Sequence, residues 1–300
     1  MLLQQLINGI TLGSMYALIA LGYTMVYGIL GLINFAHGEI YMMGAYLGII
    51  FFGLLTDLGI AQNNLLLSIA ISFMGAAFYC GAYGITIERI GYRPLRHSPR
   101  LSPLISAIGM SIFLQNYVML TQGSTDKVFP ATISSAGINV FGASITFIQL
   151  VLLIISVILM SCLHLFVKKT KMGKAMRATA QDKKMASLLG IDIDRLITLT
   201  FIVGSVLAAA AGIMAAIYYG VVNFNIGNGA GIKAFTAAVL GGIGNIPGAM
   251  LGGLLLGLLE SLCSAYISSA YKDLFAFMIL ILVLILRPSG LIGRTVTEKP

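Results

Sequence analysis

Nine long apolar runs separated by short polar segments constrain this chain more than any other feature. They cover residues 3–30, 33–55, 65–87, 101–120, 145–167, 196–219, 226–244, 247–263 and 274–286. A helix needs about 20 mostly apolar residues to cross the hydrocarbon core of a bilayer. The runs therefore predict an all-α polytopic membrane protein with eight or nine transmembrane helices, which fill one domain over residues 1–300.

The composition excludes a soluble protein. Only 9% of the residues are charged and 58% are hydrophobic, whereas a soluble chain carries about 25% charged residues. A chain of this length needs far more polar side chains than these to cover a water-exposed surface. The lipid bilayer is therefore the expected solvent for most of the chain.

The sequence allows more than one membrane topology at residues 241–248. Four glycines and Pro247 fall there, inside an apolar stretch that is otherwise long enough for two spans. Glycine and proline break helices, and a broken helix at membrane depth is tolerated where it is buried in protein. We expect either two passes or a broken helix pair.

The formal charge is +8, and the positions of the basic residues predict the orientation of the chain in the membrane. Most basic residues lie in three short segments between or after apolar runs, as the positive-inside rule expects for cytoplasmic loops. This arrangement places the N-terminus outside and gives no reason to expect nucleic acid as a partner. The three segments contain Arg89, Arg93, Arg96 and Arg100; Lys168, Lys169, Lys171, Lys174, Arg177, Lys183, Lys184 and Arg195; and Arg287, Arg294 and Lys299.

Two distant segments share a short pattern. Residues 34–38 and 223–227 both read Asn-Phe-x-x-Gly, and each follows a Gly-Ser pair, at residues 13–14 and 204–205, by about 20 residues. With the predicted topology these two parts of the chain run in opposite directions. Inverted repeats with broken helices that meet near the bilayer midplane are typical of transporters. Chance similarity between glycine-rich spans remains the alternative.

No catalytic constellation is present. The three histidines are isolated, and the Gly-x-Ser-x-Gly, His-Glu-x-x-His and P-loop patterns are missing. Cys80, Cys162 and Cys263 have no metal-ligand spacing. We therefore expect no enzyme activity, no catalytic residue, no metal and no cofactor in this chain.

A few polar residues inside the apolar runs are candidates for a translocation path. A charge in the hydrocarbon core costs about 2.5–3.5 kcal/mol on insertion scales, so such residues are functional candidates or form ion pairs needed for packing. We expect Glu39 and Lys233 to face one another near the axis between the halves, and Glu260 is a further intramembrane charge. The candidate path residues are Asn34, His37, Gly38, Glu39, Asn223, Gly227, Lys233, Gly242, Gly244 and Asn245.

The polar segment 168–195 predicts a docking element. Asp182 is placed to cap a short helix over residues 183–189, which Gly190 ends. About seven residues cannot cross a bilayer, yet the helix presents an apolar stripe that calls for a protein groove or the bilayer interface. The stripe consists of Met185, Ala186, Leu188 and Leu189, and Asp194 is the expected cap of the next span.

These motifs together resemble a family. The sequence Thr-Ala-Gln-Asp at 179–182, followed by residues 185–191, resembles the coupling-helix motif of bacterial ABC importer permeases for branched-chain amino acids. Residues 11–18, 34–39, 87–94 and 233–244 extend the match along nearly the whole chain. The resemblance is to the shorter permease of the high-affinity leucine, isoleucine and valine systems. Gln181 departs from the acidic residue expected at its position.

The resemblance implies an inner-membrane, multi-pass permease subunit. Its partners would be a second related permease, two ATPase subunits that bind the ATP, and a periplasmic amino-acid-binding protein. The coupling residues that the motif implies are Ala178, Ala180, Gln181, Asp182, Met185, Ala186, Leu188, Leu189, Gly190 and Ile191.

Three other functions remain open from the residues. A passive channel is suggested by the Asn-Phe-Ala and Asn-Ile-Pro sequences at 34–36 and 245–247, but it has no use for a docking helix. A gradient-driven transporter requires a proton or sodium site at Glu39, Asp57 or Glu260. A urea or short-amide permease of the same superfamily shares the motifs.

Overall fold

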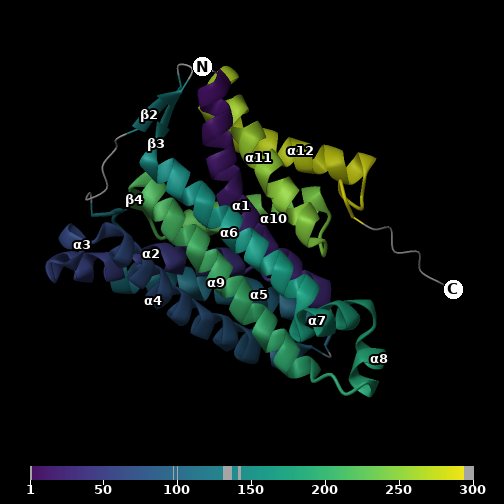
Figure 1. Ribbon diagram of the computed structural model, residues 1–300. Coiled ribbons are helices and arrows are strands. Elements are labelled where there is room, and N and C mark those ends of the chain that lie inside the picture. Colours follow the sequence, from purple (N-terminus) through teal and green to yellow (C-terminus); the bar gives the residue numbers. More distant parts are fainter. Residues whose placement is uncertain (1, 97, 100, 131–136, 141–142, 294–300) are drawn as a thin grey trace.

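The computed structural model describes residues 2–96, 98–99, 101–130, 137–140 and 143–293 and is almost entirely helical (Figure 1). The long helices are α1 (Leu2–Leu30), α2 (His37–Asp57), α4 (Leu65–Thr86), α5 (Leu101–Gln122), α6 (Phe147–Lys169), α9 (Ile193–Tyr219), α10 (Ile226–Gly241), α11 (Ile246–Tyr266) and α12 (Lys272–Leu286). The short helices are α3 (Ile60–Asn63), η1 (Ile87–Tyr92), η2 (Arg93–Leu95), α7 (Lys171–Gln181), α8 (Lys183–Leu188) and η3 (Ser269–Tyr271).

The predicted fold class is confirmed. In the described part of the chain, eight helices are long and apolar enough to span a membrane. The ninth apolar run forms α10, whose 16 residues make a helix of about 24 Å, shorter than the roughly 30 Å hydrocarbon core. The chain reverses between α10 and α11, where Gly242 and Gly244 adopt φ of +104° and +92°. Glycine is favoured at both positions because other side chains are strained at positive φ.

The two Asn-Phe-x-x-Gly segments have the same local structure. The side-chain oxygen of Asn34 accepts a hydrogen bond from the Ala36 backbone, and that of Asn223 accepts one from the Asn225 backbone. Each asparagine therefore forms a turn that redirects the chain into the following helix. The apolar run at residues 33–55 becomes helical only from His37, where α2 begins.

Helix packing confirms an inverted repeat. Helix α1 packs on α11 in the same way that α9 packs on α4. Helix α2 contacts both α4 and α9, and its counterpart α10 contacts both α11 and α1. Helix α1 ends beside the segment from which α9 begins, since Lys183 donates a hydrogen bond to the Leu30 carbonyl, so the two helices are antiparallel. The halves meet where α2 crosses α10, with Gly38 against the Gly227 carbonyl.

Glycines allow the helices of each half to touch through their backbones. A side chain at Gly13 would lie 2.8 Å from the backbone of Leu254, and one at Gly253 would collide with the backbone of Ala17. Small residues in membrane helices permit such close approach and the dispersion contacts that hold the helices together. These glycines therefore serve the packing of α1 on α11.

The described residues include four short strands, which the sequence did not predict. Strand β1 (Lys127–Val128) pairs antiparallel with β4 (Val221–Val222), and β2 (Gly137–Val140) pairs with β3 (Ala143–Thr146). The first pair joins the segments that follow α5 and α9, and the second leads into α6 beside the N-terminal end of α1 (Figure 1). These strands pair backbone groups of the segments between the long helices.

The α1–α11 contact gives a testable prediction. Replacing Gly253 by valine should prevent the close approach of the two helices and lower stability by about 1–3 kcal/mol or more. Gly109 is a matched control, because it is a helical glycine whose added side chain would meet open space. The melting temperatures of the detergent-purified variants should fall for Gly253→Val and change little for Gly109→Val; equal values would contradict this packing.

Candidate functional site

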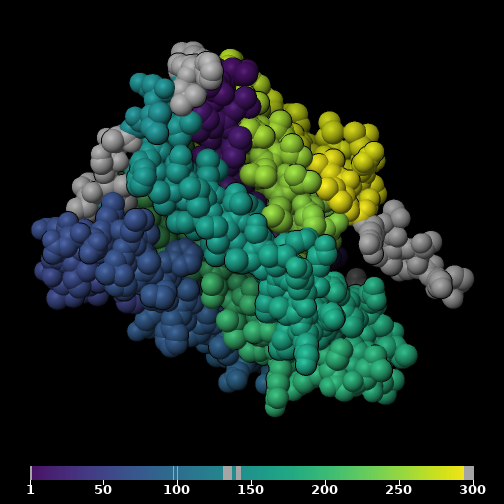
Figure 2. All heavy atoms as spheres, viewed as in Figure 1, coloured from purple at the N-terminus to yellow at the C-terminus, as the bar shows by residue number. Residues whose placement is uncertain are grey.

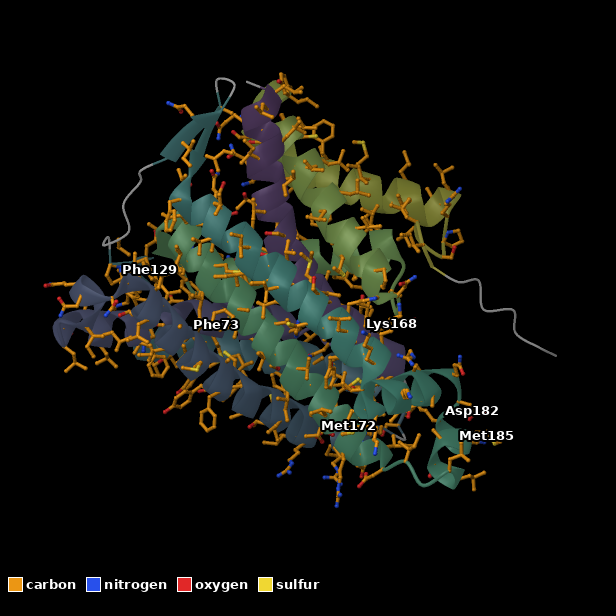
Figure 3. The ribbon with its side chains drawn as sticks, viewed as in Figure 1. Phe73, Phe129, Lys168, Met172, Asp182 and Met185 are labelled. Carbon is orange, nitrogen blue, oxygen red and sulfur yellow. The ribbon has the colours of Figure 1, made fainter. Side chains whose placement is uncertain are left out.

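Residues 168–195, here called the coupling segment after their predicted role, form a projection at one end of the bundle. Figure 2 shows it standing out beyond the long helices, and Figure 3 shows Asp182 and Met185 in it, far from Phe129. The Asp182 carboxylate accepts hydrogen bonds of 2.8 and 3.0 Å from the backbones of Lys184 and Met185, so it caps α8 as predicted. Gly190 follows at φ +81°, with open space around it.

The apolar stripe of α8 is real but smaller than expected. Met185, Leu188 and Leu189 expose 57%, 80% and 77% of their surface. Ala186 is 2% exposed, so its assignment to the exposed stripe was wrong: its side of α8 packs inward, toward the rest of the chain. Of the other implied coupling residues, Ala180, Gln181 and Asp182 are exposed, whereas Ala178 and Ile191 are half-buried.

Asp194 does not cap the following helix, contrary to expectation. Asp192 has that role, because its carboxylate accepts the backbone hydrogen bond of Arg195. Asp194 instead forms ion pairs with Arg93, at 2.9 Å, and with Arg96. Arg96 also pairs with Glu88, whose side chain is fully buried. The ion pairs tie the start of α9 to the π-helical end of α4.

The coupling segment also contacts the end of α1. The Lys183 ammonium donates a 3.0 Å hydrogen bond to the Leu30 carbonyl, which is one of the unpaired carbonyls at the end of α1. Burial and the charge of Arg96 lower the pKa of Lys183. The coupling segment is therefore joined to α1 through Lys183 and to α9 through the chain itself.

Several predicted path residues lie in the buried crossing of α2 and α10. Asn34, His37 and Glu39 are each 1% exposed, and the His37 ring fills the space that a side chain on Gly22 would need. The Glu39 carboxylate accepts a 3.1 Å hydrogen bond from Ser111 of α5. These side chains are packed between helices rather than open to a cavity.

Glu39 and Lys233 do not face one another, so this prediction was wrong. Lys233 projects from the side of α10 toward α11 and α12, where its ammonium lies 2.6 Å from Glu260 and 2.7 Å from Asp273. Tyr16 of α1 donates a 2.9 Å hydrogen bond to the second oxygen of Glu260. The intramembrane lysine is thus paired with the glutamate that sequence reasoning singled out separately.

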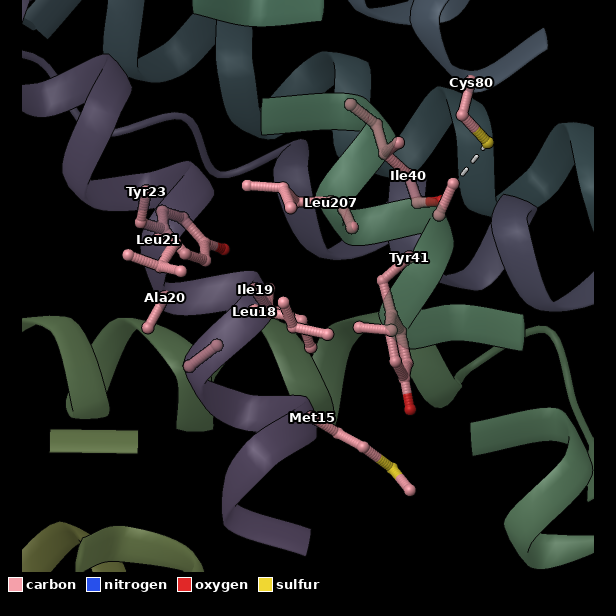
Figure 4. Close-up of a cluster of buried hydrophobic side chains, with 14 of the residues drawn as sticks. Met15, Leu18, Ile19, Ala20, Leu21, Tyr23, Ile40, Tyr41, Cys80 and Leu207 are labelled. Carbon is pink, nitrogen blue, oxygen red and sulfur yellow. Dashed lines mark hydrogen bonds between the residues drawn. The ribbon is translucent and has the colours of Figure 1, made fainter. Parts of the chain in front are cut away.

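Lys233 forms part of the wall of a cavity of about 330 Å³, here called the Lys233 cavity. Figure 4 shows two of its lining side chains, those of Met15 and Tyr41. Three tyrosines and two asparagines give the wall a polar character inside a largely apolar bundle. The lining residues are Leu12, Met15, Tyr16, Tyr41, Tyr219, Asn223, Asn225, Ile226, Gly229, Ala230 and Lys233.

Only Asn223 and Lys233 of the predicted path residues line this cavity. Sequence reasoning missed the tyrosines, because a tyrosine in an apolar helix gives no sign of which neighbour it will face. Gly242 and Asn245 lie at the other end of α10, where the Asn245 amide donates a 2.8 Å hydrogen bond to the Ile292 carbonyl. Gly242 and Asn245 contact residues 289–293, which follow α12, and so hold them against the α10–α11 turn that also contains Gly244.

Comparison with known proteins identifies the class. Residues 5–284 match the family model described as branched-chain amino acid transport system / permease component. The chain is 55% identical to the high-affinity branched-chain amino acid transport system permease protein LivH of Escherichia coli K12, over 99% of this chain and 97% of the relative. It is 52% identical to BraD of Pseudomonas aeruginosa over the same shares. No solved structure matches.

The chain therefore belongs to the family of branched-chain amino acid transport permeases. It is a multi-pass protein of the bacterial inner membrane and a transport subunit rather than an enzyme. A more distant relative, at 28% identity over 95% of this chain and 91% of its own length, is the probable LivH of the archaeon Methanocaldococcus jannaschii.

The buried ion pair beside the coupling segment gives the second prediction. Replacing Arg96 by methionine leaves the buried Glu88 carboxylate without its cation and should destabilise the protein by about 3–5 kcal/mol. Arg195→Met removes an exposed pair with Asp192 and should cost about 0–1 kcal/mol. Thermal unfolding of the purified variants measures both; an Arg96 variant as stable as the Arg195 variant would refute the role of the pair.

Proposed function

We propose that this chain is the permease subunit of an ATP-driven importer that moves leucine, isoleucine and valine inward by alternating access. The similarity to LivH and BraD over almost the entire chain supports this substrate class. The antiparallel halves give the two sides of the bundle equivalent packing, which suits a path that opens to each side in turn. The chain itself carries no cofactor in this proposal.

The partners that we propose are a second related permease, two ATPase subunits and a periplasmic binding protein. In this proposal the ATPase subunits bind and hydrolyse the ATP, because the sequence of this chain contains no nucleotide-binding P-loop. Specificity is assigned to the binding protein, which would leave the permease to offer a transient site only.

The observation that carries the proposal is the exposed stripe of α8. Met185 and Leu188 on the six-residue helix α8 and Leu189 at its C-terminal cap expose three large apolar side chains outside the spanning helices. A short apolar face of this kind fits a groove in another protein. We propose that the groove belongs to an ATPase subunit, and that closure of the ATPases moves α8 and with it α1 and α9.

The path in this proposal runs past the crossing of α2 and α10. Its candidate segments are residues 34–39, 223–227 and 241–247, and the second of them lines the Lys233 cavity. Alternating access requires the helices at such a site to shift against one another. The closest contact of the crossing suits such a shift, because Gly38 meets the backbones of Gly227 and Gly231 there.

Purification and transport test the proposal directly. The permease should co-purify with two ATPase subunits, and proteoliposomes containing the complex should take up labelled leucine only with ATP inside and binding protein outside. Labelled urea and acetamide serve as the alternative substrates. Uptake of urea instead of leucine, or uptake of leucine without ATP, would refute the proposed function.

The stripe on α8 gives the third prediction. Leu188→Asp places a charge in the proposed ATPase groove, and burial of an unpaired charge costs several kcal/mol, so ATP-dependent leucine uptake should fall at least about tenfold. Ser187→Asp is the matched control, because Ser187 lies on the same helix outside the stripe and is exposed. Both variants should insert into the membrane equally well. Equal uptake by the two variants would contradict docking of the stripe.

Gly190 gives the fourth prediction. A valine at φ +81° strains the backbone by about 1–2 kcal/mol, which should displace the end of α8 and uncouple ATP hydrolysis from uptake. Gly59 has φ +74° and equally open surroundings beside α3, so Gly59→Val is the matched control. The ratio of leucine transported to ATP hydrolysed should drop for the Gly190 variant alone.

A further inference from the structure

The ion cluster at the Lys233 cavity is unusual in its charge count. One ammonium, that of Lys233, lies within 2.7 Å of two carboxylates, Glu260 and Asp273. If all three groups are ionised, the cluster carries one excess negative charge in a region where charges are costly. One carboxylate is enough to neutralise the ammonium, so the second is not needed for that purpose.

The two carboxylates differ in how firmly they are held. Glu260 is 5% exposed and also accepts the hydrogen bond of Tyr16, so it has a second donor and a fixed position. The Asp273 side chain is 56% exposed and lies in the first turn of α12, at the edge of the bundle. Of the two partners, Asp273 is the one that can leave Lys233 at lower cost, because it is not enclosed by other helices and, unlike Glu260, accepts no hydrogen bond from Tyr16.

The rest of the cavity wall matches the other parts of an amino acid. The rings of Tyr41 and Tyr219 and the amide oxygen of Asn223 suit an ammonium group. Leu12, Met15, Ile226 and Ala230 provide apolar surface for an aliphatic side chain. The volume of about 330 Å³ is within the range of small-molecule sites.

We infer that Lys233 binds the carboxylate of an α-amino acid in a transient site within this permease, and that Asp273 occupies Lys233 until the substrate displaces it. Glu260 and Tyr16 are positioning residues that hold the ammonium at the cavity wall. The inference rests on the proposed function, since it assigns a site to the amino acid that the importer carries. A bound carboxylate replaces that of Asp273, so the charge balance at Lys233 is unchanged during the exchange.

The decisive variant removes both charges of the buried pair. Lys233→Met combined with Glu260→Gln leaves no unpaired buried charge from that pair, so a lysine needed only for packing would be dispensable and uptake should persist. The inference expects the opposite. ATP-driven leucine uptake by the reconstituted complex should fall at least about tenfold, the worth of one charge-assisted hydrogen bond, while ATP hydrolysis stimulated by binding protein is retained.

Asp273→Asn tests the exchange itself. Without the internal carboxylate, the substrate no longer has a competitor at Lys233, so photocrosslinking of a diazirine analogue of leucine to the α1 and α10 peptides should increase about tenfold. Lys272→Met, in the same turn of α12, is the matched control and should leave crosslinking unchanged. Unchanged or lost crosslinking in the Asp273 variant overturns the inference, even if the double variant fails to assemble.

The proposed function and this inference fail in different ways. Absence of leucine uptake by the unmodified complex, with ATP and binding protein present, refutes the proposed function. Uptake by the unmodified complex together with full uptake by the double variant refutes the inference alone. Crosslinks of the analogue confined to peptides outside the cavity also refute the inference alone.

Discussion

The backbone contact between α2 and α10 is the constraint on which the rest of the structure depends. Gly38 and Gly227 have no side chains, so the two helices cross with their backbones touching. Lipid provides little hydrophobic force between helices, and close packing of small residues has to supply the attraction. The two Asn-Phe-x-x-Gly turns are thereby brought together, and the Lys233 cavity forms beside them, lined partly by the first turns of α10.

Two sites far apart in the structure share the same helices. Helix α1 touches the coupling segment at Leu30 and the Lys233 cavity at Tyr16. Helix α9 starts at the coupling segment and reaches the cavity at Tyr219. Because a helix is a stiff element, motion at α8 can reach the cavity along two helices without a chain of side-chain rearrangements.

The ion pairs divide into two groups with different surroundings. Arg96, Glu88 and Asp194 lie beside the coupling segment and join η1 and η2 to α9. Lys233, Glu260 and Asp273 lie within the bundle and join α10, α11 and α12. Both groups contain a buried carboxylate, Glu88 in the first and Glu260 in the second. The second group differs in that its cation, Lys233, also lines a cavity, and the proposed substrate site is placed there for that reason.

The sequence by itself determined the fold class, the positions of the apolar helices, the break near Gly242 and the cap of α8, because each depends on local composition or on one residue type. The repeated Asn-Phe-x-x-Gly pattern also predicted the meeting of the two halves. Partners across the bundle were decided by tertiary structure alone: Lys233 with Glu260 rather than Glu39, and Ala186 facing inward. A side chain's direction depends on the rotation of its helix, which only packing against the other helices sets.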